Sequence, residues 1–112
     1  MYKIYAGLVF WLLAQLPAAG QAVFTTAYAH QAEVKVWVAA YENQAHLNVW
    51  KAAYQHQAEG NEGHWFFTDY AHQAQKKIFF VDHAHQAHLK VFFVDQAYQA
   101  GWRRPERKHL LY

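Results

Sequence analysis

The stretch KKIFFVDHAHQAHLKVFFVDQAYQA, residues 76–100, contains two consecutive copies of one sequence unit. Each copy has a Lys, a run of β-branched and aromatic residues, an Asp, and then the dipeptide Gln-Ala. The dipeptide recurs along the chain with spacings of 13, 13, 16, 13 and 13 residues, at Gln31, Gln44, Gln57, Gln73, Gln86 and Gln99. A fixed period of this kind predicts a repeat architecture in which every unit has the same supersecondary structure.

The longer spacing between Gln57 and Gln73 comes from an insertion of three residues, Gly60, Asn61 and Glu62. Counted on this basis, the units cover residues 27–39, 40–52, 53–68, 69–81 and 82–94, with a partial unit from residue 95. The sequence therefore predicts one small domain of about six units.

The second half of each unit is rich in β-branched and aromatic residues, as in residues 35–38, 77–81 and 90–94, and this composition favours strands. The alternation continues past the Asp, so a strand of about ten residues with its reversal at Gln-Ala is one interpretation. We expect one equivalent aromatic residue per unit in the core: Trp37, Trp50, Phe66, Phe79 and Phe92.

The other interpretation places short helical turns in the segments of Ala, Gln and His, with Asp69, Asp82 and Asp95 as N-caps. Hairpin signals such as Asn-Gly or Asp-Gly are missing from the sequence. Repeated strands without hairpin turns favour a regular winding over an up-and-down meander.

Residues 1–20 have the features of a secretion signal. Lys3 precedes an apolar run of about 13 residues, which is shorter than the ~20 residues that span a bilayer as a helix. The small residues Ala18 and Gly20 favour cleavage before Gln21, and cleavage after Ala22 is the alternative. We therefore expect residues 21–112 to be exported to the periplasm or the extracellular space, with no transmembrane segment after cleavage.

The charge and the cysteine content restrict the partners and the source of stability. The chain has 10 Lys+Arg against 8 Asp+Glu, a formal net charge of +2, which gives no electrostatic case for nucleic acid as a partner. It has no Cys, so its stability outside the cytoplasm must come from packing, to which an aromatic content of 19% can contribute.

Three features of the sequence resemble the bacterial septoil knot family, formerly a domain of unknown function. They are the repeated Tyr-x-x-Gln-Ala followed by Lys-Val-Phe-Phe-Val-Asp, the inserted Gly60-Asn61-Glu62-Gly63 and the ending Gln99-Ala100-Gly101-Trp102-Arg103. The resemblance covers about residues 23–112. It implies a mainly β, small single-domain repeat fold whose backbone forms a seven-crossing torus knot. It implies no activity, ligand or catalytic residue.

The residues that most enzymes use are scarce. The chain has no Ser and no Cys, and Thr25, Thr26 and Thr68 have no matched base near them in sequence. Asp69, Asp82 and Asp95 recur at one repeat position, which indicates a structural role. We expect no enzyme activity and no catalytic residue.

The histidines are the most distinctive polar residues. In a strand, His83-x-His85 would place two imidazoles on one face, and His88 follows shortly after. Neutral imidazoles bind Zn, Cu and Ni, so these three residues are the candidate metal site. The alternative is that His replaces an aromatic ring at a half-buried repeat position, and no closed four-ligand spacing is present.

These observations predict a secreted structural or binding module whose partner the sequence does not identify. A His-dependent metal-binding protein of the cell envelope and a glycan-binding module are the alternatives. The basic tail, residues 103–108, is a candidate contact for the envelope or for glycans, with a solvated end as the simpler interpretation.

Overall fold

The computed structural model describes residues 21–111, so the expected secretion signal, residues 1–20, lies outside the described residues. Seven strands are present in this part of the chain: β1 (Gln21–Thr25), β2 (Val34–Val38), β3 (Leu47–Lys51), β4 (His64–Phe67), β5 (Lys76–Phe80), β6 (Leu89–Val94) and β7 (Gly101–Trp102). They fall in the halves of the repeat rich in β-branched and aromatic residues, as the composition predicts.

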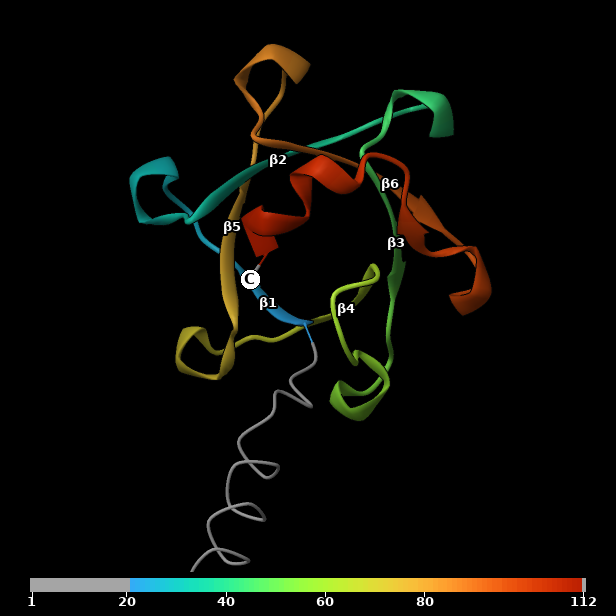
Figure 1. The fold of residues 1–112 in the computed structure, drawn as a ribbon. Coiled ribbons are helices and arrows are strands. Elements are labelled where there is room, and N and C mark those ends of the chain that lie inside the picture. The colour runs from blue at the N-terminus through green and yellow to red at the C-terminus, as the bar shows by residue number, and fades with distance from the viewer. Residues whose placement is uncertain (1–20, 112) are drawn as a thin grey trace, which may run out of the picture.

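The first six strands form a closed parallel barrel. Their order around the barrel is β4-β1-β5-β2-β6-β3, and β3 pairs in turn with β4 (Figure 1). Strand β7 pairs in the antiparallel direction with the first residues of β3, Leu47 and Asn48, whereas Trp50 and Lys51 at the end of β3 pair with β4. Closure leaves none of the six barrel strands with a free edge, which removes the usual site of strand-to-strand aggregation.

The chain follows the barrel in two interleaved laps, β1 to β3 and β4 to β6. Every connection between consecutive barrel strands passes over one strand, except that β3 and β4 are direct neighbours. If every connection passed over one strand, the chain would be back at the position of β1 after β3, because the barrel has six positions. The connection from β3 to β4 leads to the adjacent position instead, and the second lap can then fill the three remaining positions. This exceptional connection contains the insertion, with Gly60 and Gly63 at φ of 70° and 91°. The double winding is consistent with the expected knot.

The barrel interior is filled by rings of six side chains, one from each strand at the same repeat position. The middle ring has no solvent exposure and consists of Val23, Val36, Val49, Trp65, Ile78 and Val91. Each buried aliphatic side chain of this size stabilises the fold by about 1.5–3 kcal/mol. This ring is therefore the main source of stability in a chain without disulfides.

The prediction of an aromatic core is wrong, because in each unit the core residue is the one that precedes the expected aromatic residue. Each of the expected aromatics is only half-buried and follows a residue of the middle ring, so alternation turns it to the outer face: Trp37, Trp50, Phe66, Phe79 and Phe92. The reason is the width of the barrel, because six strands enclose less space than the eight whose interior side chains just fill. Small branched side chains therefore occupy most of the middle ring.

The chain reverses through six corner turns, each containing a short 3-10 helix: η1 (Ala29–Gln31), η2 (Glu42–Gln44), η3 (Gln55–Gln57), η4 (Ala71–Gln73), η5 (Ala84–Gln86) and η6 (Ala97–Gln99). The turns project outward around the barrel (Figure 1). The interpretation as short helical turns is confirmed, and the strand of ten residues is wrong. The Asp residues are not the N-caps, since Tyr70 and His83 occupy that position.

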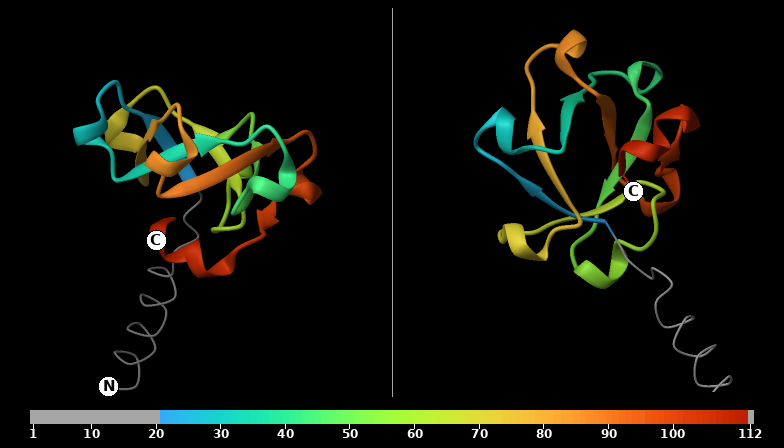
Figure 2. Two further views of the ribbon diagram at one scale, coloured as in Figure 1. Left: turned by 90° about the horizontal axis from the view of Figure 1, so that it is seen from above. Right: turned by 60° about the vertical axis from the view of Figure 1, so that its left-hand side comes forward.

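The tail closes one end of the barrel. The 3-10 helix η7 (Pro105–Leu111) lies against the end where the strands begin (Figure 2). Leu111 is 1% exposed there, and its carbonyl accepts a hydrogen bond of 3.1 Å from Gln21 Nε2. None of the helices within residues 21–111 has the length and apolar content that crossing a bilayer requires.

Candidate functional site

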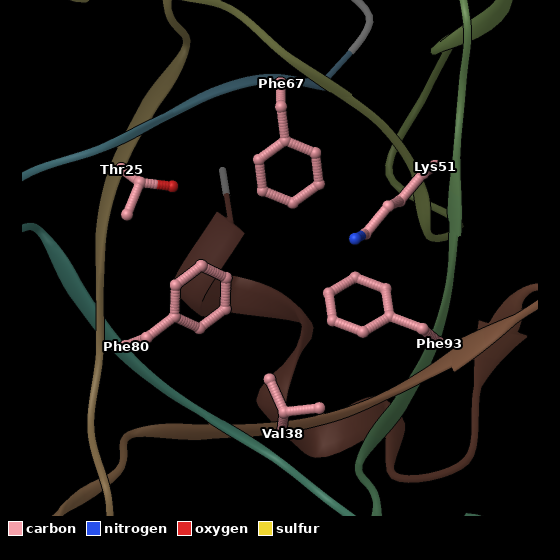
Figure 3. A pocket seen from close by; sticks show the side chains of 6 residues that line it. All are labelled: Thr25, Val38, Lys51, Phe67, Phe80 and Phe93. Carbon is pink, nitrogen blue, oxygen red and sulfur yellow. The ribbon is translucent and has the colours of Figure 1, made fainter.

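The opposite end of the barrel, where the parallel strands finish, has no cap within residues 21–111 and contains a hollow of about 360 Å³. Its lining is one side chain from each barrel strand at one repeat position: Thr25, Val38, Lys51, Phe67, Phe80 and Phe93. We call these six residues the open mouth, and Figure 3 shows their side chains converging on the barrel axis. Carboxyl ends of parallel strands are a common place for ligand sites.

Aromatic and non-aromatic side chains alternate around the open mouth. The second-lap strands β4, β5 and β6 contribute Phe67, Phe80 and Phe93, and the first-lap strands between them contribute the three other residues. Three half-buried rings thus form an apolar wall with smaller side chains in the gaps. The hollow is within the ~300–1,000 Å³ range of small-molecule sites, whose lining is also mostly apolar.

Lys51 carries the single charge of the open mouth. Its Nζ lies 4.5 Å from the centroid of the Phe93 ring and 5.7 Å from that of Phe67 (Figure 3). Three ion pairs are found within residues 21–111: Lys76–Glu33, Arg103–Glu42 and Lys108–Glu62. Lys51 belongs to none of them, so its charge is balanced at short range by aromatic rings and solvent.

The open mouth is not among the sites predicted from the sequence, although the sequence contains a signal for it. Its six residues follow the same spacing of 13, 13, 16, 13 and 13 as the Gln-Ala dipeptides. Each lies two residues after the middle ring and therefore on the same face of its strand. Lys51 stands out at this position, because the other five side chains are uncharged.

The residue two positions after the repeated Gln clamps a neighbouring strand, a role that the sequence analysis also missed. The backbone N–H of His46 donates to the carbonyl of Lys90 over 2.8 Å, and the Nδ1 of the His46 ring accepts the backbone N–H of Lys90 over 2.9 Å. At three equivalent positions a side-chain atom accepts the backbone N–H of another strand: Glu33 Oε1 over 3.0 Å, Gln75 Oε1 over 2.7 Å and His88 Nδ1 over 3.0 Å. Side-chain acceptors at one repeat position are the sequence signal for this clamp.

The clamp at His46 requires a neutral imidazole. Burial lowers the pKa of His46 below its ordinary value of 6.5, and the positive charges of Arg107, Lys90 and Arg104 lower it further. Glu106 opposes this effect. A neutral ring keeps the Nδ1 lone pair available for the Lys90 N–H.

The structure separates the three histidines of the candidate metal site by role. The rings of His83 and His85 stack at the η5 corner turn, with centroids 5.6 Å apart. His88 lies in the clamp position, where Nδ1 accepts the Lys35 N–H. Within residues 21–111 there is no group of three or more His, Cys, Asp or Glu side chains placed to hold a metal ion. Metal binding at His83, His85 and His88 stays a prediction.

The corner turns expose aromatic rings in a regular pattern. Tyr28 stacks on His30 and Tyr54 on His56, each pair with centroids 5.8 Å apart. The Tyr side chains of these turns are between 59% and 84% exposed: Tyr28, Tyr41, Tyr54, Tyr70 and Tyr98. Stacking within a pair holds each ring in one orientation, so its free face is presented to solvent.

A second hollow, of about 420 Å³, lies beside the most exposed of these rings, Tyr98. The carboxylates of Glu42 and Asp95 and the amide of Gln99 share its lining with Phe92 and Phe93. It therefore combines an aromatic face with hydrogen-bonding groups.

The basic tail is occupied in part by contacts within the fold. Lys108 Nζ lies 2.8 Å from Glu62 Oε1, and Arg107 Nη1 donates to the carbonyl of His88 over 3.3 Å. The backbone N–H groups of Arg103 and Arg104 donate to the carbonyl of His46. The tail thus has a structural role at the closed end, and an envelope or glycan contact by residues 103–108 stays a prediction.

Comparison with known proteins identifies the family. A sequence model of the 7(1) septoil knot domain matches residues 20–103. No curated protein and no solved structure matches the chain. The matched region contains all seven strands and the open mouth, and it ends before η7.

Proposed function

The chain belongs to the 7(1) septoil knot domain family, and on that premise we propose that it is an exported, non-enzymatic binding module whose open mouth holds a small apolar ligand. The observation that carries this proposal is the open mouth itself. Three Phe side chains and Val38 surround a hollow of about 360 Å³ that is open to solvent. Exposing such a surface has a free-energy cost in water, and a ligand that covers it recovers that cost.

The binding test uses a neutral fluorescent probe, N-phenyl-1-naphthylamine, titrated with the protein of residues 21–112. We expect saturable binding with one site per chain, and Phe80→Asp should abolish it because a carboxylate in the apolar wall is poorly compatible with the probe. The control is Tyr41→Asp, the same change at an exposed ring of a corner turn. Equal binding by wild type and Phe80→Asp, with both folded by circular dichroism, would argue against the open mouth as the site.

Export rests on the leader-like composition of residues 1–20, and the family match begins at residue 20. The expected outcome is a native protein that starts near Gln21 and is recovered outside the cytoplasm. Mass spectrometry of the native protein tests this, and a chain that retains Met1 would contradict it.

Glycan binding is the second candidate, and the hollow beside Tyr98 favours it. An exposed aromatic face stacks on a sugar ring, while Glu42, Asp95 and Gln99 can bond its hydroxyls. A glycan array with wild type and Tyr98→Ala separates this candidate from the first. Binding that is lost in Tyr98→Ala and kept in Phe80→Asp would assign glycan recognition to the second hollow.

Metal binding at His83, His85 and His88 is the third candidate. A metal at a hundredfold excess over its dissociation constant would stabilise the fold by about 2.7 kcal/mol. Thermal unfolding with Zn²⁺, Cu²⁺ and Ni²⁺ measures this, and an unchanged melting temperature with all three would exclude a specific site.

A further inference from the structure

Lys51 lies between two aromatic neighbours of the open mouth. Strand β3 is flanked by β6 and β4, which carry Phe93 and Phe67, and the Lys51 Nζ is 4.5 and 5.7 Å from the centroids of these rings. Figure 3 shows the ammonium group directed inward, toward the barrel axis. A ligand between the Phe rings would therefore lie next to a positive charge.

No carboxylate of residues 21–111 is paired with this ammonium group, and none lines the open mouth. A cation above half-buried aromatic rings gains less stabilisation than a hydrogen bond to a charged partner would give it. An anionic group on a ligand would therefore add an interaction that the protein itself does not supply at this position.

Carboxylates are also present at this end of the barrel, outside the lining of the open mouth. Asp69, Asp82 and Asp95 each follow a Phe of the open mouth by two residues, and all three are exposed. Asp95 follows Val94, the register partner of Trp50, so its backbone lies beside that of Lys51, although its carboxylate forms no ion pair with the ammonium group. A ligand with a second negative group near the rim would be repelled.

We propose that the open mouth binds amphipathic monoanions, of which aryl carboxylates are the simplest class. The aryl group lies among Phe67, Phe80 and Phe93, and the carboxylate pairs with the Lys51 ammonium group. The three Asp residues disfavour dianions. This assignment rests on the proposed function, since it names the ligand class of the same site.

The test compares four naphthalenes that share one apolar body: 2-naphthoate, 2-naphthylmethanol, 2-naphthylmethylammonium and naphthalene-2,6-dicarboxylate. Binding is measured by calorimetry at pH 7.5, and its position by NMR shifts of Val38, Thr25 and the indole N–H of Trp65. Trp65 is a local reporter because its ring lies 6.1 Å from that of Phe67, and its buried Nε1 has no hydrogen-bond partner within residues 21–111.

We expect 2-naphthoate to bind about fivefold more tightly than the alcohol, as for a partly exposed ion pair, and the dicarboxylate and the amine to bind more weakly than 2-naphthoate. Lys51→Met should abolish the preference, so that 2-naphthoate and the alcohol bind this variant with equal affinity. Lys77→Met, at an exposed lysine on the outer face of β5, should retain the preference.

Each other result has a defined meaning. Equal affinity for 2-naphthoate and the alcohol, or tighter binding of the amine, would overturn the monoanion assignment and leave the open mouth as an apolar site. Shifts centred on Tyr98 and Glu42 would overturn it as well, by moving the ligand to the second hollow. Failure of all four compounds to bind would reject the proposed function itself.

Discussion

The two ends of the barrel differ although the same six strands form both. At the closed end, Val34, Leu47 and Leu89 are at most 2% exposed, because η7 and Leu111 cover them. At the open end, Val38 is 42% exposed and three Phe rings are half-buried. A barrel buries its middle but not its ends, so each end needs a separate cover. This chain supplies that cover at one end, and the other end keeps an apolar surface that is available to a ligand.

The largest expected effect concerns the middle ring, which separates the two ends. Ile78→Ala should lower the free energy of unfolding by about 4 kcal/mol, because the side chain is fully buried and a cavity remains. The matched control is Phe79→Ala, one residue along the same strand on the outer face, with an expected loss of about 1 kcal/mol. Denaturant unfolding measures both, and a larger loss for Phe79→Ala would reverse the assignment of the two faces.

The next effect compares the covers of the two ends directly. Leu111→Ala should cost about 2.5 kcal/mol, since this side chain is 1% exposed at the closed end. Val38→Ala at the open end should cost about 0.5 kcal/mol, as for an exposed side chain. Similar losses in the two variants would mean that the ends are equally covered and that the comparison fails.

A smaller effect depends on pH and belongs to the closed end, where the tail contacts His46. Since the pKa of His46 is below 6.5 in the folded protein, the unfolded chain takes up the proton at a higher pH than the folded one. Its contribution to stability is therefore complete above pH 6.5 and falls as the pH drops from 6.5 through the lowered folded-state pKa.

The chain offers a matched control for this titration, because Gln75 makes the equivalent clamp with a side chain that does not titrate. His46→Gln should keep the hydrogen bond to Lys90 and remove this part of the pH dependence, so the variant should lose less stability than the wild type between pH 8 and pH 5. Chemical unfolding at pH 5 and pH 8 gives the comparison. Identical pH profiles for wild type and variant would show that the clamp does not depend on the protonation of His46.

The smallest effect concerns the open end. Lys51→Met should change the free energy of unfolding by less than about 0.5 kcal/mol, because the lost cation–π contact is replaced by apolar contact with the same rings. The melting temperature measures this. A large loss of stability would mean that Lys51 stabilises the fold. The open end would then contribute to stability in the same way as the closed end.

Much of the fold could be predicted from the sequence. The period of 13 residues, the strand-forming halves and the three-residue insertion are visible in the printed chain, and the family follows from the same motifs. The sequence allows two interpretations of the corner turns, because segments of Ala, Gln and His favour neither strand nor helix strongly enough over six residues.

The candidate site could not be predicted in the same way. Phe79 and Phe80 are neighbours of the same type, and alternation shows only that they face opposite sides. Which side is inside depends on the barrel, which exists only after strands distant in sequence have paired. Thr25 of β1 and Ile78 of β5, for example, are register partners although 53 residues separate them.

By itself, the sequence determined that six equivalent strands form, because β-branched and aromatic residues recur at a fixed period. Only the tertiary structure decided which residues meet: parallel closure brings one side chain per strand into each ring, and the narrow interior selects Ile78 over Phe79. It also decided which end is covered, because η7 folds back on the beginnings of the strands and leaves Lys51 and the three Phe rings at the other end.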